Sequence, residues 1–161
     1  MPNDLEILPA TEADVPLILT FIRELAEYEK LAHEVVATED LLRRYLFGER
    51  RFAEVLLARA TGEAVGFALF FHNFSTFLAQ PGIYLEDLFV VPEQRGRGIG
   101  RALLERLAQI AIERGCGRLE WAVLDWNREA IGFYERLGAT PNSDWTVYRL
   151  TGESLLGLAR Q

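Results

Sequence analysis

The sequence predicts an α/β (α+β) fold in which flanking helices cover a mixed, mostly antiparallel sheet. Two observations predict this class. Residues 52–74 have the pattern of two apolar strands around a turn, and strand and helix patterns alternate from residue 83 onward. The hairpin implies antiparallel strands, whereas strands separated by a helix can pair in parallel. A length of 161 residues fits one domain, so we expect residues 1–161 to form a single domain.

Each element is predicted from hydrophobic periodicity and from the residues that begin or end helices. Thr11 and Asp14 form a capping box for the first helix, Thr38 caps the second helix, and Gly48 ends it. A turn signal at residues 61–63 joins the hairpin strands. The expected elements, in order, are a strand at 5–8, helices at 15–29 and 39–47, strands at 52–59 and 64–74, a loop at 75–82, a strand at 83–91, a helix ending at 114, a strand at 118–124, a helix at 130–137, a strand at 145–150 and a short helix at 153–159.

Composition excludes several classes of protein. Seventeen Lys and Arg against 24 Asp and Glu give a net charge of −7, which argues against a nucleic-acid partner. Neither a signal peptide nor a long apolar span is visible, so we expect no membrane partner. The single cysteine, Cys116, cannot form an internal disulfide, which favours a cytoplasmic location. His33 and His72 lack metal-ligand spacing, so we expect no metal.

A glycine-rich run, QRGRGIG at residues 94–100, lies where a predicted strand meets a long helix. Such a junction presents unpaired backbone N–H groups to an anion, and Arg95, Arg97 and Arg101 add positive charge. A P-loop is excluded because no lysine follows these glycines. A dinucleotide fingerprint is excluded because Arg101 or Leu103 stands at its third glycine. The run therefore predicts a phosphate-binding loop, or simply a loop that caps a helix.

This run resembles the signature R/Q-x-x-G-x-G/A of the GNAT N-acetyltransferases, with Arg95, Gly98 and Gly100 at its defining positions. Further segments resemble the diamine and thialysine acetyltransferases related to spermidine/spermine N1-acetyltransferase: LAEYEK at 25–30, YLEDLFV at 84–90, DWN at 125–127, FYERLGA at 133–139 and ESLL at 153–156. The resemblance implies the GNAT fold with a splayed central strand, acetyl-CoA as co-substrate, and a homodimer.

The resemblance also implies which residues bind acetyl-CoA. Strand backbone groups would pair with the pantetheine arm, and the glycine run would cradle the pyrophosphate. The expected set is Leu88, Phe89, Val90, Arg95, Gly96, Arg97, Gly98, Ile99, Gly100, Arg101, Asn127, Arg128, Glu129, Ala130 and Tyr134. Asn127 has an equally good structural role as the N-cap of its helix. Leu137 stands where relatives usually carry a basic residue, so the charge of that cofactor contact is missing here.

Two residues are expected to move protons. An alkyl amine must lose a proton before it attacks, and Glu86 would accept that proton, through water. The alternative role for Glu86 is a salt bridge at the sheet edge. Asp87 is expected on the opposite face, because strand side chains alternate. Tyr134 would protonate the departing thiolate of CoA, and its alternative role is packing on the sheet. Cys116 lies between two glycines with no histidine near it in sequence, and is expected to be a small core residue.

The acceptor is expected to be a small cationic amine: a diamine, a polyamine or a thialysine-like amino acid. Acids and aromatic faces suit such a molecule, and the resemblance assigns Tyr28, Glu29, Glu86, Glu120, Trp121 and Trp126 to its site. Tyr28 and Glu29 have an equally ordinary role as the packed and solvated end of a helix. Two other functions stay open: a protein acetyltransferase acting on a lysine or N-terminal amine, and a noncatalytic acyl-CoA-binding module.

Overall fold

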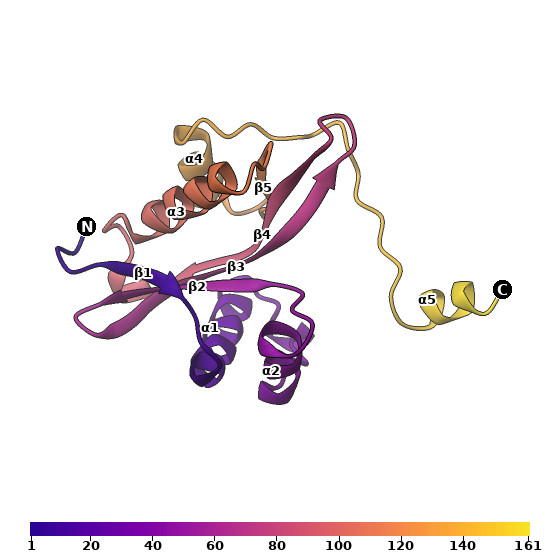
Figure 1. The fold of residues 1–161 in the computed structure, drawn as a ribbon, viewed down its shortest axis with the longest axis horizontal. Coiled ribbons are helices and arrows are strands. Elements are labelled where there is room, and N and C mark those ends of the chain that lie inside the picture. The colour runs from indigo at the N-terminus through magenta and orange to yellow at the C-terminus, as the bar shows by residue number, and fades with distance from the viewer. The chain divides into compact units, whose positions relative to one another are not determined.

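The computed structural model describes residues 1–161, which form two compact units. Residues 1–122 are the first unit and residues 123–161 the second, and each is described by itself. The first contains β1 (Glu6–Pro9), α1 (Val15–Tyr28), α2 (Glu39–Phe47), β2 (Glu54–Ala60), β3 (Glu63–Ser75), β4 (Gln80–Val90), α3 (Ile99–Glu113) and β5 (Leu119–Trp121), with single 3-10 turns at Glu12–Asp14, Ala32–Glu34 and Pro92–Gln94 (Figure 1). The second contains α4 (Arg128–Arg136) and α5 (Gly152–Ala159).

The sheet of the first unit confirms the predicted mixed, mostly antiparallel topology. Its strand order is β1-β2-β3-β4-β5, with antiparallel pairs except for the parallel pair of β4 and β5. The predicted loop at residues 75–82 is wrong, because β3 runs to Ser75 and β4 starts at Gln80. A tight turn suffices there, since the Ser75 hydroxyl accepts the backbone N–H of Leu78 at 3.2 Å.

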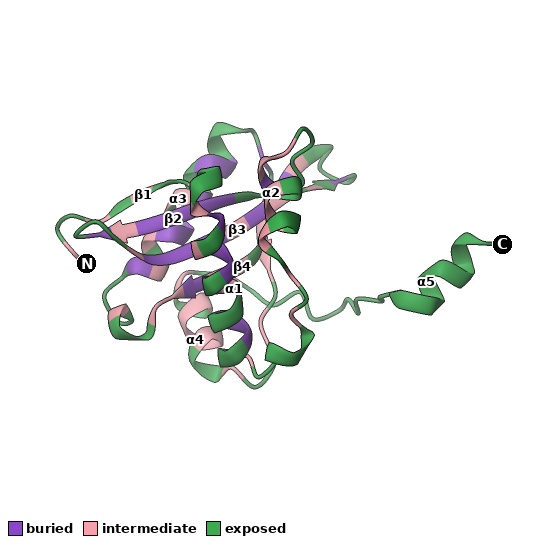
Figure 2. Ribbon diagram, turned by 90° about the horizontal axis from the view of Figure 1, so that it is seen from below, coloured by how far each residue is buried: buried purple, intermediate pink, exposed green.

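Helices cover both faces of this sheet. In Figure 1, α1 and α2 lie on one face and α3 on the other. The core cluster under α1 and α2 joins these helices to the central strands, and Phe21 stacks on Phe67 with ring centroids 5.6 Å apart. Its buried members are Ile18, Phe21, Leu25, Leu46, Val55, Leu57, Phe67 and Phe89. Figure 2 shows that burial is concentrated on the strands and on the inner sides of the helices.

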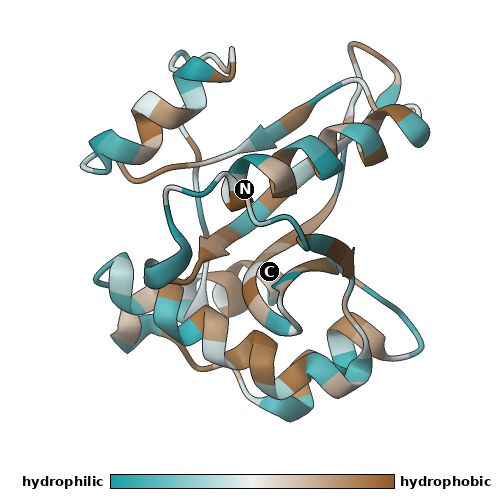
Figure 3. Ribbon diagram, turned by 90° about the vertical axis from the view of Figure 1, so that its left-hand side faces the viewer, coloured by the Kyte–Doolittle hydropathy of each residue, from teal (hydrophilic) through white to brown (hydrophobic).

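The helices form where the sequence predicts them, because their apolar residues recur at helical spacing. Figure 3 shows the resulting division of helix surfaces into hydrophobic and hydrophilic stripes. At the start of α1, the Asp14 carboxylate accepts the Thr11 N–H at 2.8 Å, and at α2 the Thr38 hydroxyl accepts the Leu41 N–H at 3.2 Å. None of the helices combines the length and the apolar composition needed to cross a bilayer.

Two predicted strands differ from the structure. Of the strand expected at 118–124, only the three residues of β5 form a strand, because the pairing of β5 with β4 ends at Leu85. The strand expected at 145–150 is absent, and every residue from 140 to 161 is exposed. Within the second unit no neighbouring strand could satisfy its backbone groups. The single-domain assignment over residues 1–161 stays a prediction.

Candidate functional site

A bulge in β4 determines where the acids of this strand point. In the pairing of β3 with β4, Leu69 is opposite Asp87 and Phe70 is opposite Leu85, so Glu86 is an extra residue without a partner. Such a bulge interrupts the alternation of side chains. Residues directly opposite in a sheet share a face. Leu69 packs against the core cluster under α1, which puts Asp87 on that same face. Phe70 alternates with Leu69, so Leu85, opposite Phe70, faces the other side. Glu86 then alternates from Leu85 onto the face of Asp87.

The expectation that Asp87 points away from Glu86 is therefore wrong. Burial raises the pKa of the Asp87 carboxyl to about 6, and the nearby charges of Glu86 and Glu29 add to the rise. Burial also raises the pKa of Glu29, again with a contribution from Glu86. These three carboxylates are close enough to repel one another. The bulge, which no local sequence signal revealed, places both β4 acids beside the end of α1.

The row of acids continues along the sheet through an aromatic residue. In register, Tyr84 lies between Phe71 of β3 and Glu120 of β5, and the ring centroids of Phe71 and Tyr84 are 5.4 Å apart. Burial raises the pKa of Tyr84, and the charges of Glu86 and Glu120 raise it further. We call Glu29, Asp87, Glu86, Tyr84 and Glu120 the acidic row. No local sequence pattern pointed to Tyr84 or to this face for Asp87.

The members of the acidic row differ in the partners they have. Glu120 is held by Arg118 at 2.9 Å and by the side-chain amide of Asn73 at 3.0 Å. Glu86 is exposed and takes part in none of the ion pairs, so the alternative of a salt bridge at the sheet edge is not observed. Trp121, opposite Leu85, is half-buried. An ammonium group beside the row would relieve the repulsion among its carboxylates.

Asp87→Asn is expected to stabilise the protein at neutral pH. Since the folded-state pKa of Asp87 is raised from 3.8 to about 6, the folded protein retains a proton that the unfolded chain has released between these values. Wild-type stability therefore falls as pH rises through this window and stays low above it. We compare the unfolding free energy of the asparagine variant with that of wild type at each pH. This difference is expected to favour the variant by about 1–2 kcal/mol more at pH 8 than at pH 3.5, a range that allows for the partial exposure of Asp87. Urea unfolding of both proteins at the two pH values measures this, and a difference independent of pH would contradict it.

The other edge of the site is an open stretch of β4 followed by the glycine run. Because β5 pairs only with residues 83–85, the backbone from Leu88 to Val90 has no strand partner on that side. Gly96 and Gly98 have φ values of 75° and 83°, in the left-handed region that favours glycine, and no other group lies within 4 Å of a Cβ built at Gly96. Gly98 directly precedes α3, whose first N–H groups have no intrahelical acceptor. This arrangement fits an amide-containing arm and a pyrophosphate.

The three arginines of the run have different neighbours. Arg97 donates to the side chain of Gln94 at 2.7 Å, and Arg101 pairs with Glu105 at 2.8 Å. Both are exposed, so these surface contacts are weak and both side chains can turn to a phosphate. Arg95 instead donates from Nε to the carbonyl oxygen of Val90 at 2.9 Å.

The second unit carries the remaining predicted residues. The Asn127 side chain caps α4, because its Oδ1 accepts the N–H of Ala130 at 3.2 Å. Tyr134 is half-buried in α4, with its ring centroid 5.5 Å from that of Phe133. Trp126, Arg128 and Glu129 are exposed. The structural role expected for Asn127 is thus observed, and the cofactor contacts of these residues stay predictions.

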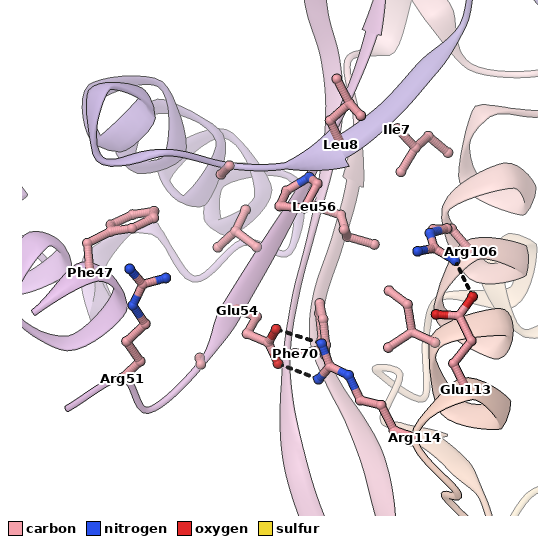
Figure 4. Close-up of a pocket in the computed structure, with 15 residues that line it drawn as sticks. Ile7, Leu8, Phe47, Arg51, Glu54, Leu56, Phe70, Arg106, Glu113 and Arg114 are labelled. Atoms are coloured by element: carbon pink, nitrogen blue, oxygen red, sulfur yellow. Dashed lines mark hydrogen bonds and ion pairs between the residues drawn. The ribbon is translucent and has the colours of Figure 1, made fainter. Parts of the chain in front are cut away.

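A separate pocket of about 270 Å³ lies in the first unit where β1 ends (Figure 4). Its walls contain the two-contact ion pair of Arg114 with Glu54, at 2.6 and 2.9 Å, and the pair of Arg106 with Glu113 at 3.0 Å. No residue predicted for the cofactor or acceptor site lines it. The acidic row and the glycine run, and not this pocket, form the candidate active site.

The model of the Acetyltransferase (GNAT) family matches residues 20–139. The chain belongs to this family. The match spans the glycine run and the segments with Glu86 and Tyr134, and GNAT acetyltransferases use acetyl-CoA. The GNAT fold that the motifs implied is confirmed.

Relatives narrow the position of the chain within the GNAT family. A thialysine N-epsilon-acetyltransferase of Bos taurus is 43% identical, over 95% of this chain and 96% of the relative. An L-ornithine N5-acetyltransferase of Arabidopsis thaliana is 35% identical, over 91% of this chain and 84% of the relative. Among solved structures, an integron cassette protein from the mobile metagenome of V. cholerae superimposes with a TM-score of 0.82 at 31% identity, covering 98% of this chain and 99% of the other. These relatives confirm the resemblance to the diamine and thialysine branch and the assignment as an N-acetyltransferase.

Proposed function

We propose that this GNAT enzyme transfers the acetyl group of acetyl-CoA to a primary amine of a small cationic acceptor by direct attack. The acidic row carries the proposal, because three mutually repelling carboxylates, two on β4 and one at the end of α1, suit a ligand with positive charge. The names of the relatives support it, since they specify the N-epsilon of thialysine and the N5 of ornithine. A diamine, polyamine or thialysine-like amino acid has the required charge.

Acetyl-CoA supplies an acetyl group activated as a thioester. The backbone groups of Leu88 and Val90 on the open side of β4 would hydrogen-bond its amide arm, while the side chain of Phe89, between them in sequence, is buried in the core. The N–H groups of Ile99, Gly100 and Arg101 would bind its pyrophosphate together with Arg97. Further contacts are proposed from the start of α4, at Asn127, Arg128, Glu129 and Ala130. The open strand edge and the left-handed glycines support this assignment.

Two residues are proposed to transfer protons, one as an acceptor and one as a donor. An alkyl amine has a pKa near ~10.4 and is mostly protonated at neutral pH. Glu86 would accept its proton through water, while Asp87 and Glu29 hold the cationic acceptor nearby. The thiol of CoA has a pKa near ~8.5, so protonation assists its departure, and Tyr134 would donate that proton. Tyr28, Glu120, Trp121 and Trp126 complete the proposed acceptor site.

The proposal includes a cytoplasmic homodimer without nucleic-acid or membrane partners. Large apolar side chains exposed in the second unit support an interface: Trp145, Val147, Tyr148, Leu150, Leu155, Leu156 and Leu158. The single cysteine and the net charge of −7 support the location and the absence of a nucleic-acid partner.

Transfer is tested by incubating the protein with acetyl-CoA and one acceptor at a time: a diamine, ornithine, thialysine and a lysine-containing peptide. We expect free CoA thiol and a singly acetylated small amine, identified by mass spectrometry. Acetylation of the peptide alone would favour a protein acetyltransferase. Binding of acetyl-CoA without any acetylated product would favour a noncatalytic binding module.

A further inference from the structure

Arg95 lies at the open edge of β4 and not among the other arginines of the glycine run. The N–H of Val91 donates to the carbonyl of Val65 on β3 at 2.9 Å. Because backbone groups alternate along a strand, the polar groups of the preceding Val90 point to the opposite side. That side is the one without a strand partner beyond Leu85. Arg95 Nε donates to the Val90 carbonyl there, at 2.9 Å.

The guanidinium of Arg95 also contacts two aromatic rings. Its central carbon lies 4.7 Å from the ring centroid of Tyr28 and 5.5 Å from that of Phe89. Tyr28 is the last residue of α1, directly before Glu29 of the acidic row. Arg95 thus joins the end of α1 to the strand that carries Glu86.

These contacts require the shape of an arginine. Its planar guanidinium can stack on an aromatic face while Nε donates a hydrogen bond. The ammonium of lysine can donate a hydrogen bond or lie over one ring, but it has no planar face with which to make all of these contacts at once. A phosphate-binding role would need charge near the start of α3, which lysine also provides. The Val90 carbonyl has two lone pairs, so it can accept from Arg95 and from a bound arm together.

We propose that Arg95 is a positioning residue for the acceptor: it fixes Tyr28, and with it Glu29, against β4, and does not bind a cofactor phosphate. The inference rests on the proposed acetyl transfer. It assigns Arg95 to the acceptor side of the site, although the signature to which it belongs is the cofactor loop.

The test compares Arg95→Lys with Arg95→Gln by two measurements. Calorimetry gives the Kd of acetyl-CoA, and steady-state kinetics give kcat and the KM of the amine that the wild type acetylates. We expect both variants to raise the amine KM about five- to tenfold, with kcat and the acetyl-CoA Kd changed by less than about threefold. If Lys behaves as wild type and Gln raises the acetyl-CoA Kd about tenfold, Arg95 is a phosphate ligand and the inference is wrong.

A double-mutant cycle tests whether Arg95 acts through Tyr28. Tyr28→Leu removes the ring, and we expect it to raise the amine KM as Arg95→Lys does, with no further rise in the double variant. Tyr28→Phe keeps the ring face and is expected to preserve the coupling with Arg95. Independent, multiplicative effects of the two changes would overturn the inference.

Arg43→Lys is a matched control, because Arg43 pairs with Glu39 and Asp40 on the surface of α2. It should leave the acetyl-CoA Kd, kcat and the amine KM unchanged. Thermal melting identifies variants that fail to fold. If Arg95→Gln fails to fold, the test is made with Arg95→Lys, which keeps the positive charge. If the wild type acetylates none of the amines, the proposed function fails; if it does and the variants show no rise in amine KM, only the inference on Arg95 fails.

Discussion

Tyr134→Phe is expected to lower kcat about a hundredfold while leaving the affinity for acetyl-CoA nearly unchanged. Tyr134 is half-buried, and its ring centroid lies 5.5 Å from that of Phe133. The variant keeps this ring and removes only the hydroxyl that would protonate the thiolate. Rapid-quench measurement of the first turnover reports the chemical step directly. Calorimetry gives the acetyl-CoA affinity.

Tyr45→Phe is the matched control for the loss of a hydroxyl. Tyr45 packs edge-on against Phe52, with centroids 5.5 Å apart, and no predicted site residue is involved in that contact. We expect this control to retain wild-type kcat. A folded Tyr134→Phe enzyme whose first turnover is as fast as that of wild type would remove Tyr134 from the proposed mechanism.

Glu86→Gln is expected to lower kcat/KM by ~10²-fold or more and to move the pH optimum upward. The substitution keeps the size of the side chain at the β4 bulge but abolishes proton acceptance and one negative charge. At higher pH more of the acceptor is already neutral, so the variant recovers part of its rate there. Profiles of kcat/KM against pH for variant and wild type measure both effects.

Glu39→Gln serves as the control for the loss of a surface carboxylate, since Glu39 pairs with Arg43 on α2. Its pH profile should coincide with that of wild type. If Glu86→Gln also retains the wild-type rate and profile, another group accepts the proton, and the proposed role of Glu86 is wrong.

Local signals predicted most of the first unit. The side chains of Asp14 and Thr38 form the expected helix-start contacts, a turn at residues 61–62, within the predicted 61–63, joins β2 to β3, and Gly98 precedes α3 with a positive φ. Each signal depends on residues a few positions apart, which is why sequence alone could reveal it. The glycine run and Glu86 in β4 are likewise local signals, and both predicted a site at the edge of the sheet.

The features that sequence missed depend on distant neighbours. Asp87 shares a face with Glu86 because β3 and β4 shift register between Leu69 and Phe70, and alternation along β4 alone predicts the opposite. Tyr84 lies two residues before Glu86 on β4, but its contact with Glu120 depends on the pairing of β4 with β5. The strand expected at 145–150 had suitable residues but no partner within its unit, and propensity cannot supply one.

The acidic row predicts that positive charge on the acceptor decides how well the enzyme uses it. The most direct measurement is the ratio of kcat/KM for a diamine to that for a monoamine of equal length, at low and at high ionic strength. We expect the diamine to be favoured about tenfold or more at low ionic strength, with a smaller ratio at high ionic strength because salt screens the partly exposed carboxylates. Equal kcat/KM values for the two amines at low ionic strength would contradict a site built for a cationic acceptor.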